Sequence, residues 1–179
     1  MKSSPEATKS RLVAALEAAA YADRRVSLHE FVVLTLVRDQ LAPKARPGAM
    51  PSKKIAELET AAATVLALMA HAGTRADASG ARHAALHAAM GAGAKIMGIA
   101  EGVAANAAVN LDAARAALEA LQQLAPMQKA VLVKGLFAAV TVDGTIRVAE
   151  AGLMRLVGAV LDCPLPPLLY EIDPGSLHA

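Results

Sequence analysis

Four acidic residues occupy matching places in two parts of the sequence. Asp23 is followed by Glu30, and Asp143 is followed by Glu150, at the same interval in both parts. Carboxylate oxygens are the ligands that hard divalent cations such as Ca²⁺ and Mg²⁺ prefer. If the fold brings the two parts together, these four residues predict a site for a divalent cation.

The same acidic residues also fit structural roles. Ser27 and Glu30 have the spacing of a capping box, in which each side chain accepts a backbone N–H at the start of a helix. Asp143 and Gly144 form a pair that is typical of turns. The stretch from Asp143 to Glu150 resembles the second half of an EF-hand calcium loop, but the residues before Asp143 do not supply the oxygen ligands of the first half. The sequence therefore favours turn and capping roles over cation binding.

Histidine spacing excludes a zinc protease centre of the HExxH type. Such a centre needs two histidines one helical turn apart and a glutamate directly after the first. Val33 stands where a second histidine would follow His29, and Ala84 stands where the glutamate would follow His83. Because neither histidine completes the motif, the sequence predicts no catalytic residue and, apart from the cation considered above, no cofactor.

A second histidine pattern has metal-ligand spacing. His83 and His87 have the interval that places two imidazoles on one face of a helix. With Asp77 or Glu101 nearby, they would form half of a zinc site. An exposed pair on an alanine-rich helix explains the same spacing without a metal, and the sequence favours that interpretation.

Three glycines follow this pair. Gly91 and Gly93 lie in a stretch that lacks the Gly-Lys-Ser/Thr ending of a phosphate-binding loop, and Gly98 follows a few residues later. We expect these glycines to permit a close helix crossing or to end the helix.

The composition is that of a helical protein. Of the 179 residues 55% are apolar, 44 of them alanine, and only 2% are aromatic, which favours closely packed helices over strands. The net charge of +2 indicates no nucleic-acid partner. One cysteine, Cys163, permits no internal disulfide. Residues 1–10 are too polar for a signal peptide, and the longest stretch without charged residues, 60–74, is too short to span a bilayer.

Apolar spacing and stop signals predict an all-α single domain covering residues 1–179. The second predicted helix is apolar nearly all round, so we expect it to be central and buried. The predicted helices span residues 6–22, 28–41, 54–72, 77–98, 111–124, 127–142 and 147–162.

A basic loop is predicted at residues 42–54. Three prolines and a glycine exclude a helix there, and the basic residues are Lys44, Arg46, Lys53 and Lys54. Such a loop would make a weak contact with anionic lipid headgroups if the domain lies below a membrane. A solvated connector without a partner is the favoured alternative, because the loop carries no apolar anchor.

An internal repeat relates the two ends of the chain. A shift of 120 positions gives ten identities over residues 12–41, where this composition would give about three by chance. The repeat contains all four acidic residues named above. It predicts two similar helical hairpins, at about residues 10–41 and 130–162, related by a pseudo-twofold axis.

The duplicated Asp-Gly-x-Ile-x-x-x-Glu hairpin resembles the TerB-like fold of tellurite-resistance proteins. Three stretches together resemble, more specifically, the C-terminal region of a bacterial family of membrane-bound HExxH zinc metalloproteases related to HtpX and the CAAX prenyl proteases. They are residues 22–31 (ADRRVSLHEF), residues 124–126 (LAP) with 143–150 (DGTIRVAE), and residues 161–169 (LDCPLPPLL). The resemblance spans about residues 10–170.

The resemblance implies a non-catalytic interaction or regulatory domain. It would form the cytoplasmic part that follows the membrane spans and protease domain of a larger protein, tethered through that protein to the inner membrane. Its partners would be the protease domain of the same chain or other proteins, and zinc would belong to that protease domain. The alternative is an independent TerB-like metal-binding or stress-response module of the tellurite-resistance type. Neither interpretation specifies an oligomeric state.

Overall fold

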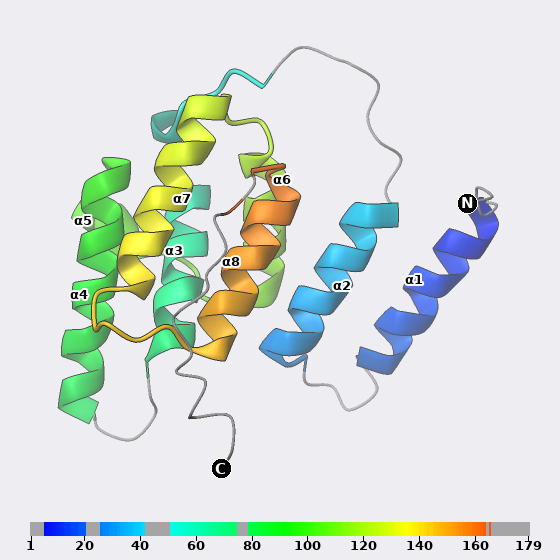
Figure 1. Ribbon diagram of the computed structural model, residues 1–179, viewed down its shortest axis with the longest axis horizontal. Helices are drawn as coiled ribbons and strands as arrows, with labels where there is room; N and C mark the ends of the chain where they lie inside the picture. The colour runs from blue at the N-terminus through cyan, green and yellow to red at the C-terminus, as the bar shows by residue number, and fades with distance from the viewer. Residues whose placement is uncertain (1–5, 21–25, 42–50, 75–78, 164, 166–179) are drawn as a thin grey trace, which may run out of the picture.

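The computed structural model describes residues 6–20, 26–41, 51–74, 79–163 and 165. Within these residues the protein is all-helical and contains no strand, which confirms the predicted fold class (Figure 1). The helices are α1 (Glu6–Ala20), α2 (Leu28–Leu41), the 3-10 helix η1 (Ile55–Glu57), α3 (Glu59–Gly73), α4 (Ser79–Met97), α5 (Glu101–Ala105), α6 (Leu111–Leu121), α7 (Pro126–Val140) and α8 (Val148–Val160).

Local signals determine where several helices begin and end. The Asn110 side chain accepts a hydrogen bond from the Ala113 N–H at 2.7 Å and so caps α6. Pro126 occupies the first turn of α7, where its missing N–H costs nothing. Gly98 ends α4 with a φ of +69°, in the left-handed region that glycine adopts without strain. Among the described α-helices, apolar spacing did not predict the short helix α5.

Helix α3 is the centre of the bundle. Every residue from Ala62 to Ala70 is buried, and α4, α5, α6, α7 and α8 all pack against this helix. The prediction that the second helix would be central is therefore wrong. Helix α2 is apolar on several sides because it lies between α1 on one side and α8 and α6 on the other, and its Val33 is 40% exposed.

Helices α4 and α7 cross closely at two glycines. A Cβ atom on Gly135 would lie 2.5 Å from Cγ of Met97 and 3.0 Å from the carbonyl oxygen of Gly93, and a Cβ on Gly93 would lie 3.0 Å from the carbonyl oxygen of Gly135. Only glycine permits this approach of the two backbones. The predicted close crossing is thus confirmed at Gly93, whereas Gly91 is exposed and faces open space.

The two predicted hairpins correspond to α1–α2 and α7–α8. Helices α2 and α8 pack against each other, and in Figure 1 both run upward, with α1 and α7 on their outer sides. This is the arrangement that a twofold axis parallel to the helices would generate. Helix α1 is joined to α2 by an ion pair in which Nε of Arg38 donates to Glu17 Oε1 at 3.0 Å.

Backbone hydrogen bonds join the residues just before η1 to the connection between α6 and α7. The Lys53 N–H donates to the Gln123 carbonyl at 3.0 Å, and the Ala125 N–H donates to the Lys53 carbonyl at 2.9 Å. Lys54 is exposed, whereas Lys44 and Arg46 of the predicted basic loop lie outside the described residues.

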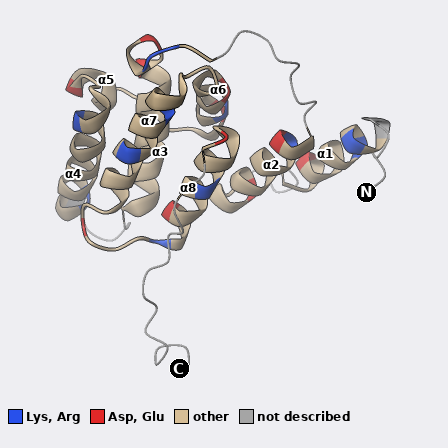
Figure 2. Ribbon diagram, turned by 45° about the horizontal axis from the view of Figure 1, so that its top comes forward, with Lys and Arg blue, Asp and Glu red and all other residues tan. Residues whose placement is uncertain are grey.

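Charged residues are interspersed along the described helices (Figure 2). In the described part of the chain, no helix combines the length and the apolar character needed to cross a membrane.

Candidate functional site

Glu30 forms the capping box that its spacing predicts. The backbone N–H and the hydroxyl of Ser27 each donate to Glu30 Oε2 at 2.7 Å, and the Glu30 N–H donates to Ser27 Oγ at 3.2 Å. The hydroxyl bond from Ser27, supported by the backbone bond, lowers the pKa of Glu30 below its ordinary value. Glu30 is therefore held as a carboxylate at the start of α2.

Glu150 occupies the equivalent position at the start of α8 in a different environment. Its Oε2 accepts the Arg147 N–H at 2.7 Å, and the Arg147 guanidinium lies 3.8 Å away. Glu150 is only 3% exposed. Burial raises the pKa of this carboxyl, and the bond and charge from Arg147 offset the rise only in part.

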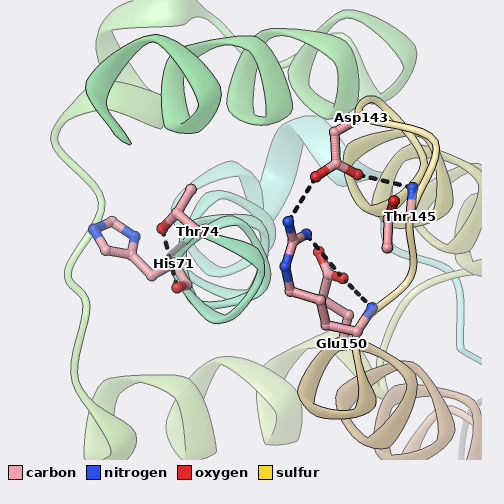
Figure 3. A network of polar contacts seen from close by, with 6 residues as sticks. His71, Thr74, Asp143, Thr145 and Glu150 are labelled. Carbon is pink, nitrogen blue, oxygen red and sulfur yellow. Dashed lines mark hydrogen bonds and ion pairs between the residues drawn. The ribbon is translucent and has the colours of Figure 1, made fainter. Parts of the chain in front are cut away.

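Asp143 joins this network from the turn between α7 and α8 (Figure 3). One carboxylate oxygen accepts the Thr145 N–H at 3.0 Å, and the other accepts from Nη2 of Arg147 at 2.9 Å. Partial burial would raise the pKa of Asp143, but the Thr145 N–H and the Arg147 guanidinium outweigh it and lower the pKa. Arg147 thus bridges Asp143, in the turn between the helices, and Glu150, in the first turn of α8.

The end of α3 makes room for Glu150. A Cβ atom on Gly73 would overlap Oε1 of Glu150 and lie 2.8 Å from its Cδ. The carboxyl group therefore lies directly against the backbone of Gly73. Spacing along the sequence gave no signal for this contact, because it joins residues on two helices that are far apart in the chain.

The predicted cation site is described for three of its four residues. Asp23 lies outside the described residues. Glu30 is bonded to Ser27, and Asp143 and Glu150 are bonded to Arg147. Among the residues that the structure describes, no three histidine, cysteine, aspartate or glutamate side chains are grouped closely enough to hold one metal ion. Cation binding by these residues stays a prediction.

The histidines of α4 line a pocket of about 300 Å³ between α3, α4 and α5. His83 and His87 are exposed, as the alanine-rich helix led us to expect. Glu101, named above as a possible neighbour, lines the same pocket, and Asp77 lies outside the described residues. The sequence did not point to His71 of α3, whose Nδ1 lies 2.8 Å from the Ala67 carbonyl oxygen and whose ring faces away from the Arg147 network (Figure 3).

The rest of this pocket is apolar. Leu86 and Met90 contribute the larger side chains, and alanines of α3, α4 and α5 contribute most of the remainder. A concave apolar surface with a few polar groups at its edge is the usual form of a small-molecule site. In the described part of the chain, the charged groups around Arg147 are bonded to one another, whereas this pocket offers a largely apolar surface. Comparisons with protein-family models, with curated proteins and with solved structures found no match to this chain.

Proposed function

We propose that this chain is a TerB-like, non-catalytic interaction or regulatory domain that forms the cytoplasmic C-terminal part of a membrane-bound HExxH zinc metalloprotease. The observation that supports the proposal is the use of the duplicated acidic residues. Glu30 and Glu150 each accept the backbone N–H of the residue three positions before them, at the starts of two neighbouring helices. Carboxylates engaged in this way stabilise the hairpins and favour a structural role for the repeat.

A contact surface for the protease domain is available on the second hairpin. Phe137 near the end of α7, Val142 in the turn and Val148 at the start of α8 are exposed, and Val148 is 92% exposed. Exposed apolar side chains on the elements that flank one turn are suited to a protein contact. The hairpin that carries them is braced internally by Arg147, so it can present them without rearranging.

The proposal is tested in the organism that encodes the chain. An antibody against the domain is used to fractionate cells and to isolate the polypeptide for peptide sequencing by mass spectrometry. We expect a membrane-bound polypeptide larger than 18.3 kDa that contains an HExxH peptide. A soluble polypeptide of the chain's own mass, without an associated protease, would contradict the proposal and favour the independent TerB-like module.

Contact through the second hairpin is tested in the same cells. A photo-crosslinking amino acid is placed at Val148, with Val33 of α2 as the matched exposed control. Crosslinked peptides should join position 148, and not position 33, to the protease domain. Equal crosslinking from both positions would eliminate this hairpin as the contact surface.

A further inference from the structure

We propose that the pocket between α3, α4 and α5 binds a medium-chain fatty acid, with the carboxylate at its histidine end and the hydrocarbon chain along α4. This inference goes beyond the proposed function and does not depend on it. A protease partner and a bound fatty acid occupy different surfaces, since the second hairpin does not line the pocket.

The pocket follows one face of α4. His83, Leu86, His87, Met90, Gly91 and Ala94 line it, and their intervals of three and four residues place them in one row along the helix. The row from His83 to Ala94 spans about 16 Å at the rise of an α-helix. The site is therefore elongated, and its length is that of an extended acyl chain and exceeds that of a compact metabolite.

Small side chains keep the row open. Ala67 of α3, Ala94 of α4 and Ala104 of α5 line the walls, and alanine fills little of the space between helices. Hydrocarbon gains favourable free energy by leaving water for such a surface, at roughly 25 cal/mol per Å² of apolar area buried. A long, thin apolar group uses this geometry better than a broad ring system.

The histidines lie at one end of the row. His83 and His87 are in the first half of α4, and His71 is close to the end of α3, the helix that precedes it in the chain. Imidazole N–H groups donate hydrogen bonds to a carboxylate. His83 and His87 thus carry the donors at the end of the row where an acidic head group would lie, and His71, whose Nδ1 lies against the Ala67 carbonyl, lines the same end.

Glu101 lies toward the opposite end. The N–H of the preceding residue, Ala100, donates to Oε1 of Glu59 at 2.8 Å, and Glu59 is the first residue of α3. His71 follows Glu59 by twelve residues, or about 18 Å along the helix axis. A carboxylate at the Glu101 end would meet a like charge, so the arrangement orients a fatty acid with its head at the histidines.

The test measures binding of laurate to the purified, delipidated chain. Carbon-13-labelled laurate, kept below its micelle concentration, is titrated and followed by NMR of the carboxyl carbon. Dodecyltrimethylammonium has the same hydrocarbon tail with a head group of opposite charge, and acetate has the carboxylate without the hydrocarbon tail. We expect saturable binding of laurate alone, accompanied by a rise in melting temperature.

Two substitutions probe the two halves of the site. Gly91→Phe places a ring in the row at a position where a Cβ meets open space, and it should weaken laurate binding about tenfold or more. His83→Gln with His87→Gln should weaken laurate binding and reduce the preference over the cationic detergent. Ala88→Phe, on an exposed position of α4 outside the pocket, and His29→Gln on α2 are the matched controls and should leave binding unchanged.

Three outcomes would overturn the proposal. The first is the lack of saturable laurate binding below the micelle concentration. The second is laurate binding that Gly91→Phe does not weaken, which would place the ligand elsewhere. The third is equal binding of the cationic detergent with the same dependence on Gly91, which would leave an apolar pocket without a carboxylate site.

Discussion

Glu30 and Glu150 occupy equivalent positions in the repeat, yet their pKa values shift in opposite directions. Ser27 explains the difference at the first position, because its hydroxyl donates to Glu30. Arg147 replaces this serine in the second copy. Its guanidinium cannot accept the Glu150 N–H, whereas Ser27 Oγ accepts the Glu30 N–H. Glu150 is also buried against Gly73. The cost of burying its charge therefore exceeds the stabilisation that the hydrogen bond and the charge of Arg147 give to the carboxylate.

The opposite shifts predict opposite effects of amide substitution. The lowered pKa of Glu30 means that its carboxylate stabilises the fold above the ordinary pKa, and this stability is lost as the pH falls through the folded-state value. Glu30→Gln should therefore lower the melting temperature near pH 7, with a difference that shrinks in acid. The raised pKa of Glu150 means that its contribution is present in acid and is lost as the pH rises through the folded-state value.

Glu150→Gln should accordingly keep or raise the melting temperature near pH 7. The amide oxygen still accepts the Arg147 N–H, and the buried charge is gone. Melting curves of wild type and both variants between about pH 3 and pH 8 measure the effect. A Glu150→Gln variant that loses stability mainly at neutral pH would contradict it.

At the scale of single residues, the sequence predicted the contacts between residues that are close together in the chain. The capping box of Ser27 and Glu30 joins residues three positions apart, and its pattern was sufficient to find it. The burial of Glu150 against Gly73 depends on two helices meeting. Sequence spacing carries no information on such a contact, so the contrast between the two glutamates could not be predicted.

Among the helices, the contact of α3 with α8 depends on Gly73. Gly73→Ala would force a methyl group into Glu150, and overpacking of this kind costs about 1–3 kcal/mol. The cost should fall when Glu150→Ala removes the carboxyl group, because the two substitutions share one contact. Chemical denaturation of the single and double variants measures the coupling. Gly152→Ala on α8, where a Cβ meets open space, is the control, and additive effects would contradict the prediction.

The crossing of α4 and α7 should be more sensitive to substitution than any exposed part of α4. Gly135→Ala would push Met97 and the Gly93 carbonyl away, separating the two helices. We expect a loss of about 1–3 kcal/mol in the free energy of unfolding. Gly91→Ala, on the exposed face, should instead add up to about 1 kcal/mol, because alanine is the better helix former. Similar changes in the free energy of unfolding for both substitutions would contradict the assignment of the close crossing to Gly135 and Gly93.

Helix positions were predictable because apolar spacing and stop signals are local. The observed α2 has the predicted bounds, and the bounds of most of the others differ by a few residues. Helix α5 is too short to show a periodic pattern. The central place of α3 could not be predicted in this way. A helix that is apolar on several sides can lie at the centre of a bundle or between two neighbours at its edge, and α2 lies between neighbours.

For the molecule as a whole, the open question at the acidic residues is a shared cation. If Glu30, Asp143 and Glu150 serve only as caps and turn residues, millimolar calcium, magnesium or manganese should leave the melting temperature unchanged. We expect this result because each carboxylate already has a bonded partner. A shift of several degrees that disappears both in Asp143→Asn and in Asp23→Asn would show a cation shared by the two hairpins. Lys54→Gln, on an exposed residue outside the repeat, provides the control.

The composition predicted an all-helical protein, because a chain rich in alanine and poor in aromatic residues suits packed helices. It did not predict the pocket between α3, α4 and α5. His83 and His87 share one helix and were visible as a pair, whereas His71 comes from another helix and Glu101 from a third. Only the packing of α3 against α4 brings these side chains to one cavity.

The peripheral position of α1 has a consequence for hydrogen exchange. Helix α1 packs mainly on α2, most of its described side chains are exposed, and Glu17 of α1 is paired with Arg38 of α2. Local opening with a small free energy releases such a helix while the remainder stays folded. Amides of α1 should therefore exchange with deuterium long before those of Ala62–Ala70 in α3, and Arg38→Met should speed exchange in α1 alone. Equal protection of both helices would contradict this expectation. Each opening of α1 would uncover the outer side of α2, so a partner that binds this side of α2 should compete with α1 for it.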